Sequence, residues 1–482
     1  MFIKKITIQN FRLFSSESIF EIDNFNIPDN TNNGSGLNVF VGENGSGKTA
    51  LLDAFALPIL EYKTENFSVD DFNNPTEKVF IKIYSKENFE VDGTMPKGSF
   101  MANGFSFEAG VRSKESKAYL SSMVVSDQKF MSVDPNKPKE SSPDLRVSVN
   151  NPFKGKRFSD NDVLFLDKNR LFQTRSGNFN RTRFDRLMED FSFQYVKKTT
   201  SSNLNDDLDE KIKKDKVENN FLSNAIKKFH GISGSSIKLD FLDNYAPFKN
   251  AFFAKRKDNN QQISLDNLGS GYEMIFSLLY SFYLAKQSGK QLIILIDEPE
   301  LHLHPTLQEK FIEFLLEFSK ETQIFITSHS PLLIKQLSHN ELVKINIIGK
   351  DQQILEMKKR VLPYISANET NFLAFDLATE EYHNEIYEEL KFINGDDKGI
   401  KAFDNDFFVT DKGEDKKSPY KGSPNEVSVH TFIRNQIHHQ KDNGKVKYDE
   451  LKKSIEKMRT LFPAETSTTV LESPTASEYC PF

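Results

Sequence analysis

A glycine-rich segment near the N-terminus has the spacing of a phosphate-binding loop. Gly42-Glu-Asn-Gly-Ser-Gly-Lys-Thr49 matches G-x-x-x-x-G-K-[ST] between an apolar run and a helix-like stretch. Glycines let backbone N–H groups close around phosphate oxygens, and the helix N-terminus adds its positive dipole end. We expect Lys48 to reach the β- and γ-phosphates and the Thr49 hydroxyl to bind Mg²⁺. The candidate phosphate-binding residues are Gly42, Asn44, Gly45, Ser46, Gly47, Lys48 and Thr49.

Acidic residues and a histidine follow two later apolar runs. Residues 292–296 are wholly apolar, which is typical of a buried parallel strand, and Asp297 and Glu298 come next. We expect Asp297 to hold Mg²⁺ and Glu298 to polarise an attacking water. His329 comes after the apolar run 324–327, where its imidazole could contact a γ-phosphate. Lys48, Glu298 and His329 are therefore the candidate catalytic residues.

A Gly/Ser turn lies between the loop and the acids. It reads Leu268-Gly-Ser-Gly-Tyr-Glu273 and precedes a long helix-like stretch. Ser270 and Gly271 would stand at that helix N-terminus, where they could bind phosphate. The turn alone is a weak signal, but its place between loop and acids strengthens the prediction.

The elements that must position these residues alternate between strand-like and helix-like patterns. Residues 2–8 alternate apolar and polar, and the strand-like runs are 37–41, 79–84, 163–166, 292–296 and 324–327. Helix-like stretches begin after Thr49, after Tyr272 and at Phe311. This alternation predicts an α/β fold with a mostly parallel sheet covered on both faces.

The order of loop, Gly/Ser turn, acidic strand and histidine resembles the ABC-type ATPase head of the SMC/RecF/OLD class. Ile8-Gln-Asn-Phe-Arg12 resembles the I-x-N-F-R opening of that class, and 299–305 its D-loop region. The resemblance covers roughly residues 1–60 and 260–345. It implies ATP and Mg²⁺ as ligands, with Thr49 and Asp297 holding the metal. One departure is that no Q-loop glutamine is found; Asp70, Asp71 and Asn73 stand there instead.

The resemblance also implies an assembly. ATP bound at Lys48 and Thr49 of one head would be completed by Ser270 and Gly271 of a second, giving a homodimer or a higher oligomer. Arg12 could approach the nucleotide, with a surface or DNA-facing arginine as the alternative.

The chain is long enough for several folding units. We expect a head in two parts, 1–84 and 256–370, interrupted by a mixed insertion lobe at 85–255 with a short hairpin at most. A small helical C-terminal domain at 371–462 and a disordered tail at 463–482 would follow. The insertion is too short for a long coiled-coil arm, which argues against a chromosome-scale machine.

The helix-like segment 429–439 carries a second group of polar residues. Arg434 and His438 are four residues apart and share one face, and His439 is within reach. The spacing Arg434-Asn435-x3-His439 resembles the R-x4–6-H motif of HEPN ribonucleases, in which an arginine and a histidine would cleave RNA without metal. The alternative is a helix used for packing or for recognition of a partner.

Composition limits the class of protein. The formal charge is -6, from 63 basic and 69 acidic residues, so a globally basic nucleic-acid coat is excluded but a local groove is not. The single cysteine, Cys480, excludes a disulfide framework. Without a signal peptide or an apolar run of about 18 residues, we expect a cytoplasmic protein that does not enter membranes.

Three hypotheses remain open on sequence alone. The short insertion favours a resemblance to PARIS-like and Septu-like phage-defence ATPases, in which the ATPase is the sensor and switch of a toxic nuclease, here a separate effector protein or the C-terminal domain. The second is a RecF/RecN-like repair ATPase that clamps DNA. The third is a nucleotide-gated, HEPN-like RNase toxin.

Overall fold

The computed structural model describes two compact units, Met1–Leu355 and Glu356–Phe482. The described residues are 2–59, 67–94, 97–111, 118–125, 161–166, 171–172, 181–182, 221–233, 236–239, 252–255, 262–264, 270–287, 291–349, 354–355, 360–364, 366–395, 398–416, 418–420, 423–439 and 445–463. Of the predicted tail at 463–482, residues 464–482 lie outside them.

A parallel sheet forms the centre of the first unit. Its order is β16-β15-β3-β14-β13-β7, and all neighbours are parallel except β15 and β16. The bounds are β3 Leu37–Val41, β7 Asn161–Leu166, β13 Gln291–Asp297, β14 Gln323–Ser328, β15 Lys344–Ile348 and β16 Ile354–Leu355. Every residue of β3 and β14 is buried, as expected for strands covered on both faces. The predicted α/β fold is confirmed.

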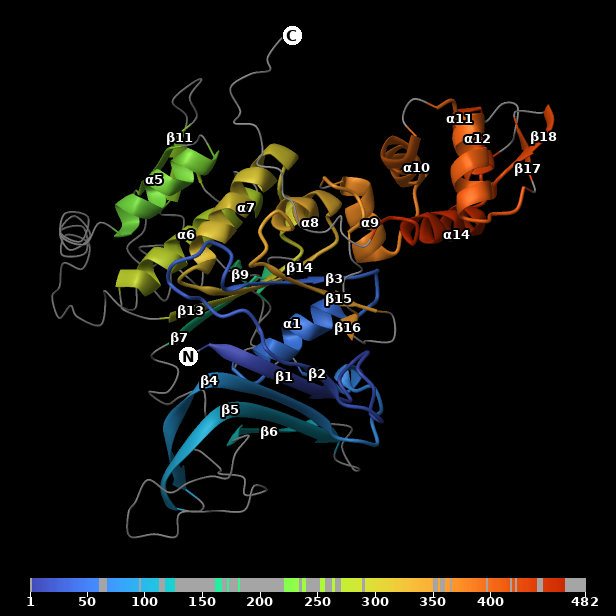
Figure 1. The fold of residues 1–482 in the computed structure, drawn as a ribbon. Coiled ribbons are helices and arrows are strands. Elements are labelled where there is room, and N and C mark those ends of the chain that lie inside the picture. The colour runs from blue at the N-terminus through green and yellow to red at the C-terminus, as the bar shows by residue number, and fades with distance from the viewer. Residues whose placement is uncertain are drawn as a thin grey trace. The chain divides into compact units, whose positions relative to one another are not determined.

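An antiparallel sheet lies on the other side of the loop helix. Its order is β2-β1-β4-β5-β6, with bounds β1 Ile3–Gln9, β2 Phe20–Ile22, β4 Val79–Thr94, β5 Lys97–Val111 and β6 Ala118–Val125. Helix α1 (Lys48–Ala56) is sandwiched between the two sheets (Figure 1). Phe55 of α1 packs against Phe325 of β14 with ring centroids 4.6 Å apart. The chain has 44 phenylalanines, and some of them form the core that holds α1 in place.

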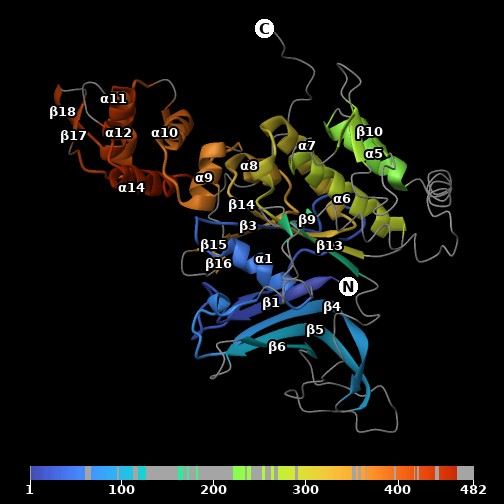
Figure 2. The same cartoon turned by 180° about the vertical axis from the view of Figure 1, so that it is seen from behind.

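Helices cover the opposite face of the parallel sheet (Figure 2). They are α6 Ser270–Gln287, α7 Pro305–Ser319 and α8 Pro331–Leu337. The first unit also contains α5 (Phe221–Ser233) and the short strands β8 Leu171–Phe172, β9 Arg181–Thr182, β10 Ser236–Leu239, β11 Phe252–Lys255 and β12 Gln262–Ser264. Among the described helices, none has the length and apolar character needed to cross a bilayer.

The range assigned to an insertion lobe contributes to both sheets of the head. From this range β5 and β6 extend the antiparallel sheet, and β7 pairs with β13 at the edge of the parallel sheet. Most of 126–220 lies outside the described residues, so a separate lobe stays a prediction. The same holds for the predicted boundary at 370/371, which lies fifteen residues beyond the end of the first compact unit.

The second unit is built mainly of helices. They are α9 Ala367–Phe375, α10 Glu380–Gly395, α11 Ile400–Phe403, the π-helix η5 Asp404–Asp411, α12 Val429–His438 and α14 Tyr448–Arg459, with a hairpin of β17 Ser418–Tyr420 and β18 Ser423–Val427. A buried polar link joins three of them: Ser454 Oγ lies 2.9 Å from His383 Nε2 and 2.7 Å from His430 Nδ1. These contacts tie α14 to α10 and α12.

Candidate active site

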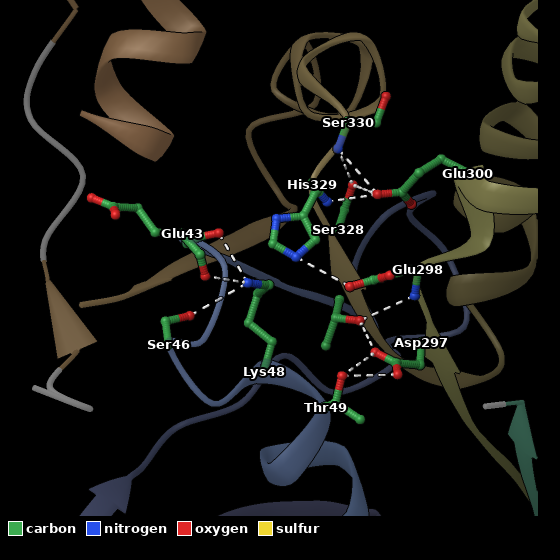
Figure 3. Close-up of polar contacts among 12 residues, drawn as sticks. Glu43, Ser46, Lys48, Thr49, Asp297, Glu298, Glu300, Ser328, His329 and Ser330 are labelled. Atoms are coloured by element: carbon green, nitrogen blue, oxygen red, sulfur yellow. Dashed lines mark hydrogen bonds and ion pairs between the residues drawn. The ribbon is translucent and has the colours of Figure 1, made fainter. Parts of the chain in front are cut away.

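The predicted catalytic residues meet at one edge of the parallel sheet. The glycine loop follows β3, His329 follows β14, and Asp297 ends β13 with Glu298 directly after it. These strands are immediate neighbours in the order β3-β14-β13, so the three segments lie side by side (Figure 3). Ligands of open α/β sheets bind at this carboxyl edge.

The loop has a conformation that depends on its glycines. Gly42 has φ 152°, and a Cβ there would lie 2.4 Å from the carbonyl oxygen of Ile348. Gly47 has φ 101° and precedes the first residue of α1. Both positions lie in the region of backbone space that glycine adopts readily, so another residue would displace the loop.

Lys48 is drawn into this loop. Its Nζ donates to the carbonyl oxygens of Gly42 at 2.9 Å and Glu43 at 2.8 Å, and to Ser46 Oγ at 3.4 Å. Burial lowers the pKa of Lys48 to about 8, although Glu298 and Asp297 favour the charged form. A buried cation beside loop amides is a suitable partner for phosphate oxygens.

Asp297 is held by two threonines. Thr49 Oγ1 donates to Asp297 Oδ2 at 3.0 Å, and Thr327 Oγ1 donates to Oδ1 at 2.5 Å. Asp297 is fully buried, and burial raises its pKa. A hydroxyl and a carboxylate at hydrogen-bond distance are the hard oxygen ligands that Mg²⁺ takes when it also binds phosphates. The described part of the chain contains no cluster of three or more His, Cys, Asp or Glu side chains that could hold a metal. Thr49 and Asp297 supply two oxygen ligands, which fits a Mg²⁺ ion whose other ligands come from nucleotide and water.

Glu298 faces His329, the third candidate catalytic residue. Its Oε1 lies 3.1 Å from His329 Nε2, and its N–H donates to Thr327 Oγ1 at 3.1 Å. Its backbone has φ 47°, a left-handed conformation that few non-glycine residues adopt. A carboxylate beside an imidazole can accept a proton from water, so this pair is suited to activate a nucleophile next to Lys48.

Sequence reasoning missed two supporting residues. Thr327 is hydrogen-bonded to both Asp297 and Glu298. Its position as a polar residue at the end of an apolar strand could have indicated this role. Glu300 accepts hydrogen bonds from the His329 loop, and nothing in the sequence indicated that contact.

Arg12 is bound to two acidic residues. Its Nη1 lies 2.6 Å from Asp53 Oδ2 of α1, and its Nε lies 2.7 Å from Asp71 Oδ1. Asn73 Nδ2 donates to the Arg12 carbonyl oxygen at 2.8 Å. Arg12 thus connects α1 to the stretch that lacks a Q-loop glutamine. Nucleotide binding by Arg12 stays a prediction.

The predicted Gly/Ser turn lies at the start of helix α6. Ser270 is the first residue of α6 and is followed by Gly271, as predicted, while Leu268 lies outside the described residues. A contact from this helix start to the nucleotide of a second head stays a prediction.

The residues of the proposed RNase motif point in different directions. Arg434 donates to Glu388 Oε1 of α10 at 2.9 Å and 2.7 Å and lies over the Tyr387 ring. Asn435 is fully buried, whereas His438 and His439 are exposed at the end of α12. Burial lowers the pKa of His438, and Arg434 acts in the same direction. These contacts suit a packing helix, and RNA cleavage stays a prediction.

Several known proteins are similar in sequence to segments of this chain. A model of the family described as "AAA domain, putative AbiEii toxin, Type IV TA system" matches residues 37–335. Septu protein PtuA of Bacillus thuringiensis is 31% identical over 100 residues, 18% of this chain and 25% of PtuA. Endonuclease GajA of Bacillus cereus (strain VD045) is 32% identical over 84 residues, 17% of this chain and 14% of GajA.

The aligned segments thus span a quarter or less of these two relatives. An SMC head solved with the C-winged helix domain of ScpA aligns with 74% of this chain and 97% of its own length, at 15% identity and a TM-score of 0.41. The match to a Septu protein confirms the resemblance to Septu-like ATPases.

Proposed function

Because the chain belongs to the family "AAA domain, putative AbiEii toxin, Type IV TA system", we propose that it binds and hydrolyses ATP as the switch of an antiviral defence system. The observation that carries this proposal is the convergence of Lys48, Asp297, Glu298 and His329 at the ends of three adjacent strands.

The residues divide the work of hydrolysis. The loop amides and Lys48 bind the phosphates, and Glu298 takes a proton from the attacking water. His329 lies against the Glu298 carboxylate, and its imidazole would contact the γ-phosphate. Thr49 and Asp297, which are hydrogen-bonded to each other, would hold Mg²⁺, and the metal would neutralise charge on the phosphates.

The biological role rests on the relatives. One is a Septu protein and another is an endonuclease. We propose that ATP binding and hydrolysis in this chain hold or release a toxic nuclease, supplied by a separate effector protein. A head homodimer closed around ATP, with Ser270 and Gly271 of the second head completing the site, is part of the proposal.

Two variants test the chemistry. Lys48→Ala should lose ATP binding and hydrolysis, and Glu298→Gln should bind ATP but hydrolyse it at least about a hundredfold more slowly. Phosphate release and nucleotide binding are measured on the purified full chain, with the exposed Lys453→Ala as the matched control. Unchanged hydrolysis in Lys48→Ala would refute the proposed ATPase site.

The defence role is tested in cells. A host carrying the gene with its neighbours should plate phage poorly, and Lys48→Ala should restore plating. Defence that survives Lys48→Ala would contradict the switch. Turnover stimulated by DNA, with no toxicity and no defence, would instead support the repair clamp.

A further inference from the structure

Glu300 binds three consecutive residues of the loop that carries His329. It lies in the 3₁₀ turn η4 (Pro299–His302), just after the acids of β13. Its Oε1 accepts hydrogen bonds from the Ser328 hydroxyl at 2.9 Å, the His329 N–H at 2.6 Å and the Ser330 N–H at 3.1 Å (Figure 3). One carboxylate oxygen thus fixes the whole connection between β14 and α8.

The second oxygen of this carboxylate has a different environment. Glu300 Oε2 is buried and has no hydrogen-bond partner among the residues that the structure describes. A buried carboxylate oxygen without a hydrogen-bond partner costs free energy, so this residue calls for an explanation. The three hydrogen bonds to Oε1 explain why Glu300 is kept here. They hold the His329 backbone in one position, which hydrogen bonds to mobile water would not do.

We propose that Glu300 is a positioning residue, which sets the His329 imidazole against Glu298 through its contacts with residues 328–330. This inference rests on the proposed ATP hydrolysis. Since η4 lies in the region that resembles the D-loop, Glu300 also couples any movement of η4 to the histidine. The role requires an acceptor oxygen at the right reach and does not require negative charge.

Two substitutions separate reach from charge. Glu300→Gln keeps an oxygen at the same reach and removes the charge, whereas Glu300→Asp keeps the charge but withdraws the oxygen by one methylene. We expect Glu300→Gln to retain most of the wild-type kcat, and Glu300→Asp and Glu300→Ala to lose about a hundredfold, with little change in the KM for ATP. Glu313→Ala, at an exposed position of α7, is the matched control.

The pathway is tested with a double variant. In a His329→Ala background, Glu300→Ala should cause no further loss, because it acts through the histidine. An equal loss in both backgrounds, or a Glu300→Gln variant as impaired as Glu300→Asp, would overturn the proposal.

A measurement without nucleotide separates this inference from the proposed function. Backbone amides of residues 329 and 330 should exchange hydrogen faster in Glu300→Ala than in the wild type, and Glu300→Gln should retain protection. Unchanged exchange in Glu300→Ala would refute the positioning role even if the chain hydrolyses ATP. Faster exchange in a chain without ATPase activity would refute the proposed function alone.

Discussion

At the scale of single residues, two consecutive acids do different work because the backbone turns between them. Asp297 is the last residue of β13 and is fixed by Thr49 and Thr327, while Glu298 has left the strand with φ 47°. A left-handed non-glycine residue costs about 1–2 kcal/mol. The bond from the Glu298 N–H to Thr327 offsets part of that cost. Strain of this kind is concentrated at functional sites, and here it turns Glu298 toward His329.

Single substitutions on α12 separate packing from RNA cleavage. Because Arg434 pairs with Glu388 and lies over Tyr387, we expect Arg434→Ala and Glu388→Ala each to lower the stability of the second unit, by about 0.5–1 kcal/mol. His439→Ala, at an exposed site, should leave it unchanged. Hydrogen exchange of α10 and α12 peptides measures this. Cell toxicity that is lost in Arg434→Ala and His439→Ala but kept in Glu388→Ala would instead support the RNase hypothesis.

At the scale of elements, local sequence patterns predict where strands and helices lie better than they predict which strands pair with each other. The runs 37–41, 292–296 and 324–327 became β3, β13 and β14, because continuous apolar stretches bounded by polar residues have few alternatives. The strand at 163–166 was also predicted, but its pairing with β13 was not. Pairing between strands more than a hundred residues apart depends on packing that no local window contains.

The same reasoning explains which site residues were found. The loop residues are adjacent in sequence, so their spacing alone reveals them. Glu300 touches residues 328–330 only because β13 and β14 are neighbours in the sheet. Asp53 and Asp71 likewise reach Arg12 through the fold. Contacts of this kind follow from topology and leave no motif.

The bundle of the second unit should weaken in mild acid. Burial lowers the pKa of His383 to about 3 and that of His430 to about 4, from 6.5. His430 and Arg434 also lower the pKa of His383. Asp404 raises the pKa of His430, and Lys457 lowers it. Both imidazoles are neutral in the folded state and take up protons on unfolding. Their contribution to stability is therefore complete above pH 6.5 and is lost as the pH falls toward 4.

We expect the free energy of unfolding of this unit to change by roughly 2–3 kcal/mol per pH unit in that window, because each of the two histidines takes up one proton on unfolding. Hydrogen exchange of α10, α12 and α14 peptides as a function of pH measures it. His430→Gln should halve the slope, and His439→Gln, at an exposed site, should not change it. A slope that is the same in His430→Gln would contradict the assignment.

At the scale of the whole molecule, the candidate site keeps partial contact with solvent. The side chains of Glu298 and His329 are 15% and 29% exposed, respectively, and Leu301 of η4, next to Glu300, is 59% exposed. Hydrolysis is controlled best where bulk water is excluded. The proposed second head would exclude water from the site, and we expect the exposed Leu301 to lie in its contact surface.

Trapping ATP should therefore trap the dimer. We expect Glu298→Gln to become a dimer in ATP and Mg²⁺, measured by light scattering during size-exclusion chromatography, and to return to a monomer in ADP. Lys48→Ala should stay monomeric because it cannot bind the nucleotide. Leu301→Asp, combined with Glu298→Gln, should bind ATP and yet fail to dimerise, since a carboxylate would be buried at the apolar contact. A Glu298→Gln chain that is saturated with ATP and remains monomeric would show that the site is closed by something other than a second copy.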